Sequence, residues 1–188
     1  MSAVTEKIVK APGRAITELE QNVARALTEI EASNIEMKVL LKGIVFASAK
    51  EVEIKADRKA VVVFFPARVW KSVQKVQGRL IHELEKKFPK QQVIFVAQRT
   101  ILDKDFRRRG LKVRPRTRTL TSVHEAMLDD IVGPAEIVGK RTHVSTDGRK
   151  TLKVILEQTD AHQEDRFAAY SAVYMKLTNK PALFMFEA

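Results

Sequence analysis

Seven basic side chains crowd into one short stretch of the sequence, RRRGLKVRPRTRT at residues 107–119. They are Arg107, Arg108, Arg109, Lys112, Arg114, Arg116 and Arg118. No acid interrupts the stretch, and removing its seven charges takes the formal net charge from +11 to +4. Guanidinium groups bind phosphate oxygens in pairs, and their flat faces also stack on unpaired bases. The stretch therefore predicts a binding site for a phosphodiester backbone, and RNA with loops offers both targets.

The backbone around Pro115 favours a regular spacing of three of these arginines. Proline restricts itself and the preceding residue to extended backbone, in which alternate side chains point the same way about 6.6 Å apart. Arg114, Arg116 and Arg118 would then form a ladder along a phosphate chain. The alternative is a solvated loop, because blocks of like charge are often disordered and bind nothing specific. The internal position of the stretch and its alternation of arginine with Pro and Thr favour phosphate binding.

Two other basic groups are weaker candidates for RNA contact. One is a stripe at helical spacing and the other lies in a predicted hairpin. Both patterns are equally typical of an ordinary solvated face. The residues are Lys71, Lys75, Arg79, Lys140 and Arg141.

Length and composition limit the classes of protein to consider. The chain has 188 residues, of which 45% are hydrophobic and 30% charged, and this predicts one globular domain over residues 1–188. A sequence pI near 9.9 predicts a polyanionic partner, either nucleic acid or an acidic membrane surface. No cysteine occurs, which excludes disulfides and thiolate metal sites. The N-terminus has no apolar signal core and no run is long enough to span a bilayer, so we expect a cytosolic or nuclear protein.

An enzyme that cleaves or modifies RNA would need acids or a metal site, and one segment offers them. In HEAMLDD at 124–130, Glu125 and Asp129 share a helix face beside His124. Acids near a helix start also stabilise the helix, and Glu125 has a predicted capping role. No phosphate-binding glycine loop or zinc-protease motif occurs. The sequence thus favours a protein without catalytic residues, metal or cofactor.

Local patterns predict the elements of the first half of the chain. Thr17 and Glu20 form a capping box that starts a helix running to about Ala32. Aromatic residues in the apolar runs, such as Trp70 and Phe95, are assigned to the core rather than to base stacking. The other predicted elements are a helix over Ile35–Leu41, a hairpin of Ile44–Ile54 and AVVVFF at 60–65 around the turn ADRK, a helix over Ala67–Phe88, and the strand QVIFVAQ at 92–98.

The second half repeats the order of hairpin, helix and strand. Ser122 and Glu125 predict a second capping box, on a helix that ends before Gly133. Asp147 and Gly148 are expected to supply the positive φ angles of a tight turn. The remaining elements are hairpin arms over Ala135–Val144 and Lys150–Leu156, a helix over Glu164–Leu177, and a final strand at LFMF.

These elements predict a mixed α/β (α+β) fold. Two hairpin–helix–strand units would surround a mixed sheet, with helices at the N-terminus. The basic stretch would form an internal loop, and residues 99–120 are the predicted RNA-contacting segment.

Several longer stretches resemble one known family. They are RKAVVVFFP at 58–66, QKVQGRLIHELEKKF at 74–88, VAQRTIL at 96–102 and RPRTRTLTSVHEAMLDDIVGPAEIVGKR at 114–141. The sequence is similar to the eukaryotic small-subunit ribosomal protein seven family, which is distinct from the bacterial protein of that number. The resemblance implies a structural, non-enzymatic component of the small ribosomal subunit that contacts ribosomal RNA through Arg114, Arg116 and Arg118.

The resemblance also implies partners and a place in the cell. The partners would be small-subunit ribosomal RNA and neighbouring ribosomal proteins, without a membrane, a cofactor or a small-molecule substrate. The protein would work in translation on cytoplasmic ribosomes and pass through the nucleolus while the subunit is assembled. Two alternatives stay open at this point, a transient RNA-binding assembly factor and an RNA-processing enzyme.

Overall fold

The strands form two three-stranded sheets, and each mixes antiparallel and parallel pairing. The computed structural model describes residues 7–10, 13–33, 35–55, 58–157 and 164–186. In the first sheet, β1 (Ser48–Lys55) pairs antiparallel with β2 (Arg58–Pro66), and β2 pairs parallel with β3 (Gln91–Gln98). Helix α4 (Trp70–Lys87) makes the crossover between the parallel strands.

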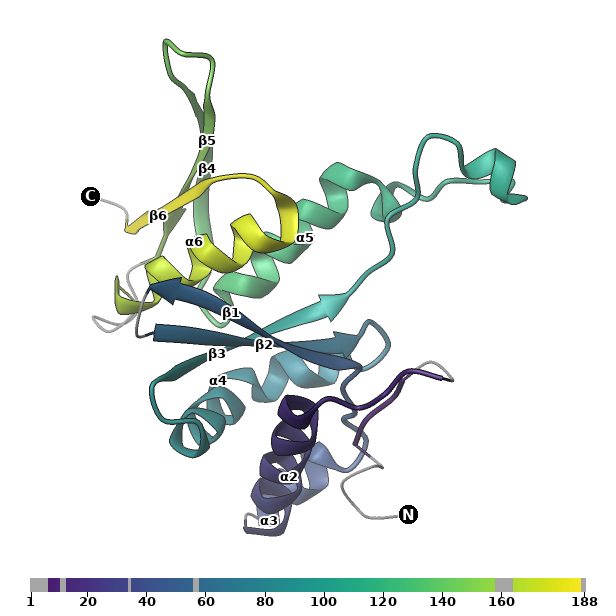
Figure 1. Ribbon diagram of the computed structural model, residues 1–188, viewed down its shortest axis with the longest axis vertical. Coiled ribbons are helices and arrows are strands. Elements are labelled where there is room, and N and C mark those ends of the chain that lie inside the picture. Colours follow the sequence, from purple (N-terminus) through teal and green to yellow (C-terminus); the bar gives the residue numbers. More distant parts are fainter. Residues whose placement is uncertain (1–6, 11–12, 34, 56–57, 158–163, 187–188) are drawn as a thin grey trace.

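The second sheet repeats this arrangement. Strand β4 (Ile137–Val144) pairs antiparallel with β5 (Lys150–Leu156), which pairs parallel with β6 (Ala182–Phe186). Helix α6 (Glu164–Thr178) makes the crossover. The predicted fold class and its two hairpin–helix–strand units are confirmed, but the single mixed sheet is wrong: each unit forms its own three-stranded sheet, because no described strand of one unit pairs with a strand of the other. The β4–β5 hairpin rises well clear of the body (Figure 1).

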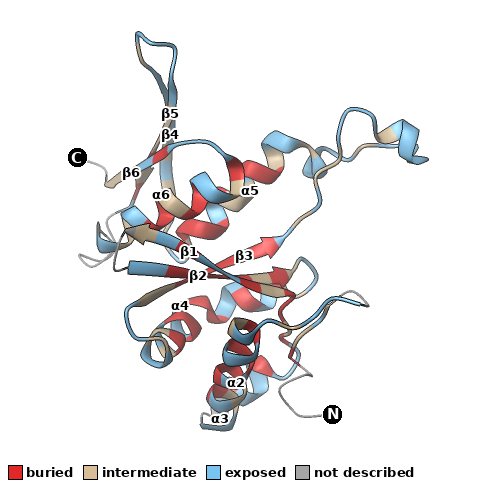
Figure 2. Cartoon of the chain, in the orientation of Figure 1, coloured by how far each residue is buried: buried red, intermediate tan, exposed pale blue. Residues whose placement is uncertain are grey.

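The central strands are buried on both faces, as the run AVVVFF predicted. Val61, Val63 and Phe65 face a core shared with α4, α2 (Glu18–Ser33) and α3 (Ile35–Leu41). Ala60 and Val62 face a second core shared with α5 (Leu120–Val132), α6 and the second sheet. The first sheet is therefore the middle layer of the molecule, with buried residues on both of its sides (Figure 2).

Aromatic residues fill the first core, as predicted from their place in apolar runs. Phe65 and Phe95 are fully buried, with ring centroids 5.1 Å apart in an edge-to-face arrangement. Trp70 packs beside Phe65 at 6.4 Å and is only 7% exposed. Phe64 is half-buried, and Lys50 Nζ lies 5.8 Å from its ring centroid. None of these rings is presented as a platform for base stacking.

The first capping box is confirmed and the second is wrong. The Thr17 N–H donates to Glu20 Oε2 at 2.8 Å, and the Glu20 N–H donates to Thr17 Oγ1 at 3.4 Å. In contrast, α5 begins three residues earlier than expected, with Thr119 at its N-cap. Ser122 lies inside the helix, with its Oγ 3.1 Å from Thr119 Oγ1. The stretch TRTLT carries no apolar periodicity that would have revealed this earlier start.

Turn residues agree with the sequence only in part. Gly148 has φ +78°, as the DG pair predicted, but Asp147 does not have a positive φ. Strand β1 begins at Ser48 rather than at Ile44. Of the predicted ADRK turn, residues 56 and 57 lie outside the described residues.

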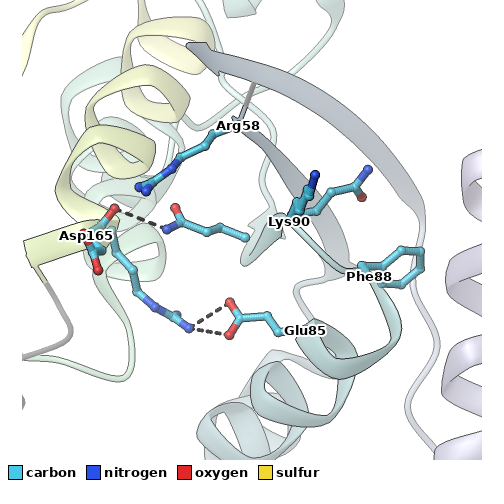
Figure 3. A pocket seen from close by; sticks show the side chains of 8 residues that line it. Arg58, Glu85, Phe88, Lys90 and Asp165 are labelled. Atoms are coloured by element: carbon cyan, nitrogen blue, oxygen red, sulfur yellow. Dashed lines mark hydrogen bonds and ion pairs between the residues drawn. The ribbon is translucent and has the colours of Figure 1, made fainter. Parts of the chain in front are cut away.

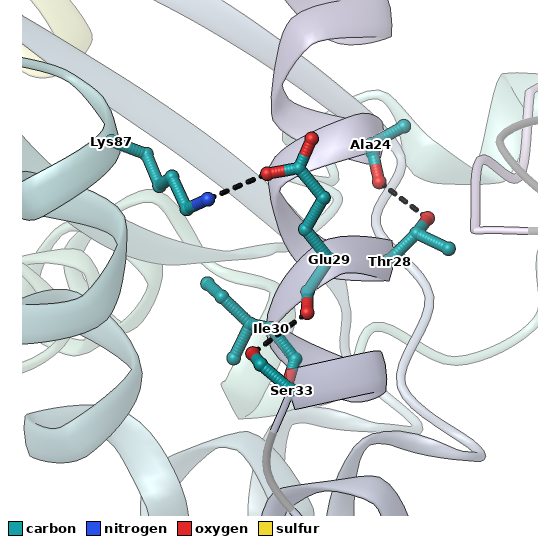
Figure 4. Close-up of polar contacts among 6 residues, drawn as sticks. All are labelled: Ala24, Thr28, Glu29, Ile30, Ser33 and Lys87. Atoms are coloured by element: carbon teal, nitrogen blue, oxygen red, sulfur yellow. Dashed lines mark hydrogen bonds and ion pairs between the residues drawn. The ribbon is translucent and has the colours of Figure 1, made fainter.

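Polar contacts join α2 to α4 and close the end of α2. Lys87 Nζ lies 2.6 Å from Glu29 Oε2 across the two helices (Figure 4). Ser33 Oγ donates to the Glu29 carbonyl at 2.8 Å, and Thr28 Oγ1 donates to the Ala24 carbonyl at 2.7 Å. Both hydroxyls are satisfied by their own helix, so the contact between the helices depends on apolar packing and this exposed ion pair.

A second ion pair joins the two halves of the chain at the end of the central sheet. Arg166 on α6 donates to both carboxylate oxygens of Glu85 on α4, at 2.7 and 2.6 Å. Gln92 on β3 donates to the Asp165 carbonyl at 3.2 Å. These groups line a hollow of about 510 Å³ (Figure 3). Both hydrogen bonds come from the same guanidinium nitrogen, Nη2, and this charged contact ties α6 to the opposite layer of the fold.

A core truncation tests the layered packing. Leu80 is fully buried in the first core, whereas Met175 on α6 is 47% exposed. We expect Leu80→Ala to lower the free energy of unfolding by about 2–5 kcal/mol, because a cavity remains where the side chain was. Met175→Ala is the control and should change it by less than about 1 kcal/mol. Urea denaturation measures both, and equal losses would contradict the assignment of Leu80 to the core.

Candidate RNA-binding surface

The basic stretch forms an arm that projects from the fold between β3 and α5. We call residues 99–119 the basic arm, and Figure 1 shows them extending away from both sheets. Of its seven predicted RNA-binding residues, only Arg114 is half-buried. The other six are exposed: Arg107, Arg108, Arg109, Lys112, Arg116 and Arg118. These cations therefore face solvent. The turn near the tip of the basic arm, Phe106–Arg109, contains no buried residue.

Two short 3-10 turns shape the basic arm. The first, Phe106–Arg109, lies near the tip and ends at Gly110, whose φ of +78° favours glycine. The second, Arg116–Arg118, lies just before α5. The three tip arginines are thus held on a single turn, and the Arg107 guanidinium lies 6.0 Å from the Phe106 ring centroid.

The predicted arginine ladder is wrong in its geometry. Pro115 is extended, with φ −62° and ψ 142°, but the three residues after it form the second 3-10 turn. A 3-10 helix has three residues per turn, so Arg116 and Arg118 point about 120° apart instead of sharing one face. The 3-10 turn is favoured over an extended strand because it pairs backbone groups that would otherwise lack a partner within the chain. The Thr119 N–H and hydroxyl both donate to the Arg116 carbonyl, at 3.1 and 2.7 Å.

The base of the basic arm is closed by hydrogen bonds between its two ends. The Leu102 N–H donates to the Arg118 carbonyl at 2.8 Å. Arg114 Nε donates to the Leu102 carbonyl at 2.9 Å, which explains why this side chain is half-buried. Arg114 therefore helps to hold the loop closed, and its remaining guanidinium nitrogens are the part left for a phosphate.

A buried carboxylate fixes the root of the basic arm, and the sequence analysis missed it. Asp130 on α5 is 4% exposed and accepts from the Ala97 N–H at 3.0 Å. It also pairs with both terminal nitrogens of Arg99, the first residue after β3. One side chain thus links the exit of β3 to α5. An acid next to Ile131, on the buried side of an amphipathic helix, was the available signal.

Charge on the basic arm is largely unopposed. Arg109 pairs with Asp103 at 2.8 Å, but both side chains are more than 60% exposed, so this pair is worth at most about 1 kcal/mol. Within the described residues, no ion pair is formed by Arg107, Arg108, Lys112, Arg116 or Arg118. These cations are free to release counterions when they meet phosphates.

The weaker candidates do not join the basic arm in one patch. Lys71, Lys75 and Arg79 are exposed along α4, as predicted. Helix α4 covers the opposite face of the central sheet from α5 (Figure 1), and its Gly78, next to Arg79, lies near Pro134 just beyond the end of α5. Lys140 and Arg141 are exposed on the β4–β5 hairpin, and Lys140 Nζ lies 2.9 Å from Asp129 on α5. The hairpin base therefore adjoins α5.

The HEAMLDD segment does not assemble as a catalytic or metal site. His124 is 8% exposed and its Nδ1 has no hydrogen-bond partner, while Glu125 and Asp129 are exposed. Burial lowers the pKa of His124, and the positive charge of Lys180 lowers it further, so the imidazole is neutral at neutral pH. Across the part of the chain that the structure describes, no three His, Asp or Glu side chains converge as metal ligands. None of the described helices is long and apolar enough to cross a bilayer.

Comparison with known proteins gives matches along nearly the whole chain. The sequence profile of the family described as Ribosomal protein S7e matches residues 7–186. Small ribosomal subunit protein eS7 of Schizosaccharomyces pombe is 48% identical, covering 99% of this chain and 96% of that protein. Small ribosomal subunit protein eS7z of Arabidopsis thaliana is 46% identical, with coverage of 99% and 97%. Protein eS7A of Saccharomyces cerevisiae is 44% identical, with coverage of 98% and 96%.

Adjacent acids on α5 give a matched test of the root of the basic arm. We expect Asp130→Ala to lower the free energy of unfolding by about 3 kcal/mol, because it leaves the Ala97 N–H and the Arg99 guanidinium without their partner. Asp129→Ala removes the same charge from the exposed pair with Lys140 and should cost less than about 1 kcal/mol. Urea denaturation monitored by circular dichroism measures the difference. Similar costs for the two variants would show that the buried carboxylate does not hold the root.

Proposed function

The chain belongs to the ribosomal protein S7e family and is a structural, non-enzymatic constituent of the small ribosomal subunit, and we propose that its basic arm docks it on small-subunit ribosomal RNA. This proposal is carried by one observation: six basic side chains are exposed on a projecting loop, and Asp130 holds the base of that loop in place. Phosphate contacts of this kind position a protein without reading sequence, so we expect recognition of RNA shape rather than of bases.

The assignment of residues within residues 99–120 follows from their surroundings. Arg107, Arg108, Arg109 and Lys112 at the tip, with Arg116 and Arg118 near the base, are the proposed phosphate contacts. Arg114 contributes through the nitrogens that Leu102 does not engage. The weaker contacts remain Lys140, once it leaves Asp129, and the α4 stripe of Lys71, Lys75 and Arg79. Arg141 on the hairpin would contact RNA only where no protein covers its face of the sheet.

The partners and cellular route extend this proposal. Neighbouring small-subunit proteins would contact the surfaces that RNA leaves open. The protein would join the subunit during assembly in the nucleolus and remain on cytoplasmic ribosomes. The alternatives of a transient assembly factor and an RNA-processing enzyme do not fit a family whose members are named as small-subunit proteins.

A triple substitution tests the basic arm. Arg107→Ala, Arg116→Ala and Arg118→Ala remove three exposed cations without touching the closing bonds of Arg114 or Asp130. If each neutralises one phosphate, the slope of log affinity against log salt for a small-subunit RNA fragment should fall by about 2–3. Filter binding between 50 and 200 mM salt measures this slope, and wild type should lose very roughly a hundredfold in affinity over that range.

The control is a second triple variant that loses the same amount of positive charge outside the basic arm. Lys38→Ala, Lys42→Ala and Lys176→Ala also remove three exposed cations, none of them in the basic arm. Incorporation is read in cells by sedimentation of tagged protein after magnesium chelation and a high-salt wash. We expect the arm variant to leave the small-subunit peak and the control to remain in it. An arm variant that incorporates like wild type would remove the basic arm from the docking mechanism.

A further inference from the structure

The β4-β5-β6 sheet has one face against the core. The strand register places Leu152 beside Ala182, and Val154 beside Phe184. Val154, Ala182 and Phe184 are at most 5% exposed and belong to the second core, together with α5 and α6. This face is therefore closed within the chain, and only the opposite face of the sheet is available for contact.

The opposite face carries a mixed row of cations and apolar side chains. We call it the open face and define it by Arg141, Lys153, Ile155, Leu183 and Met185. The register aligns Arg141, Lys153 and Leu183 across the three strands, with Ile155 and Met185 in the next row. Leu183 is 47% exposed, and Ile155 and Met185 are half-buried. In that row, Ile155 lies beside Gly139, its cross-strand partner.

The two cations on the open face are directly opposed and lack a counter-charge. Arg141 and Lys153 are cross-strand partners, which places their Cβ atoms about 5 Å apart, and like charges at such positions are destabilising. Neither side chain forms an ion pair or hydrogen bond within the described residues. Along β5 the next acid is Glu157, four residues from Lys153 and about 13 Å away. An anion from outside the chain would relieve this repulsion.

The neighbours of the cation pair decide which kind of anion fits. Leu183, Ile155 and Met185 gain from contact with apolar side chains, whereas a phosphodiester backbone offers them nothing comparable. None of the five residues that define the open face carries an aromatic ring on which a base could stack; the nearest ring on the same face of β4 is the imidazole of His143, beyond Arg141 from the apolar row. We propose that it is a docking surface for another protein, which places a carboxylate between Arg141 and Lys153 and an apolar side chain against Leu183 and Met185.

The shape of the molecule makes this surface reachable. The hairpin stands clear of the body, and Figure 2 shows its outer part exposed. β6 lies at the edge of its sheet, so a partner can cover Leu183 without displacing another strand. The inference rests on the proposed function only in that the partner is sought within the small subunit.

A photoreactive residue reports what covers the open face. Leu183 is replaced by p-benzoylphenylalanine in the full-length chain, and small subunits that have incorporated it are purified and irradiated. We expect a crosslink that survives ribonuclease and maps by mass spectrometry to a protein segment with Asp or Glu beside the crosslinked residue. A product lost on ribonuclease treatment would identify RNA as the occupant and overturn the proposal. Incorporated protein that gives no crosslink would overturn it as well.

One substitution separates binding from folding. Arg141→Glu places a carboxylate opposite Lys153, so the isolated protein should melt at the same or a higher temperature because repulsion becomes attraction. The same change removes the anion site, and the crosslink yield per incorporated chain should fall roughly fivefold. Lys38→Glu, with an equal charge change at an exposed position of α3, should leave the yield unchanged. Unchanged yield with Arg141→Glu would remove the cation pair from the interface.

The two proposals fail separately. If the basic arm does not dock the protein on RNA, its triple variant still incorporates, and the crosslink from Leu183 can still be read. If the open face has no protein partner, the crosslink is absent or sensitive to ribonuclease, whatever the arm variant does.

Discussion

Side chains on both faces of β2 and β3 are buried, so each face of the central sheet must be covered by its own layer of helices or strands. Helices α2, α3 and α4 supply one cover, and α5, α6 and the second sheet supply the other. The first cover precedes the basic arm in the chain and the second follows it, so α5 must return to the sheet that β3 has just left. The connection between β3 and α5 is therefore free to project, as long as its two ends are held at the surface.

A few polar contacts hold the two ends of this connection in place. Asp130 joins the backbone of β3 to α5 and pairs with Arg99, and the Leu102–Arg118 hydrogen bond closes the loop above it. A long basic loop without such a root would lose more conformational entropy on binding RNA. With the root fixed, only the tip and its side chains remain to be ordered, so more of the phosphate attraction appears as affinity.

The two halves of the chain share an order of elements but differ in what surrounds them. The first sheet is covered on both faces, whereas the second is covered on one. This asymmetry leaves Arg141 and Lys153 opposed on the open face beside apolar side chains, and it leaves the β4–β5 hairpin standing in solvent. A ribosomal protein has to meet both RNA and other proteins, and the two surfaces differ accordingly. The basic arm carries nine basic side chains against two acids, whereas the open face joins two cations to three apolar side chains.

Patterns local in sequence determined most of the elements. Apolar periodicity and the Thr17–Glu20 capping box placed α2 and α4, and the run AVVVFF implied burial on both faces, because these signals depend on residues close together in the chain. The family resemblance around RPRTRTLTSVHEAMLDDIVGPAEIVGKR was also present in the sequence itself.

Only the tertiary structure decided the remaining features. Asp130 became structural only when folding brought Ala97 and Arg99 to it, and Arg114 became a closing group only when Leu102 lay beside it. The turn at Arg116–Arg118 replaced the extended ladder because Thr119 and the start of α5 satisfied its backbone. The division into two sheets, and with it the open face, depends on pairings between strands that are distant in sequence, which local periodicity does not encode.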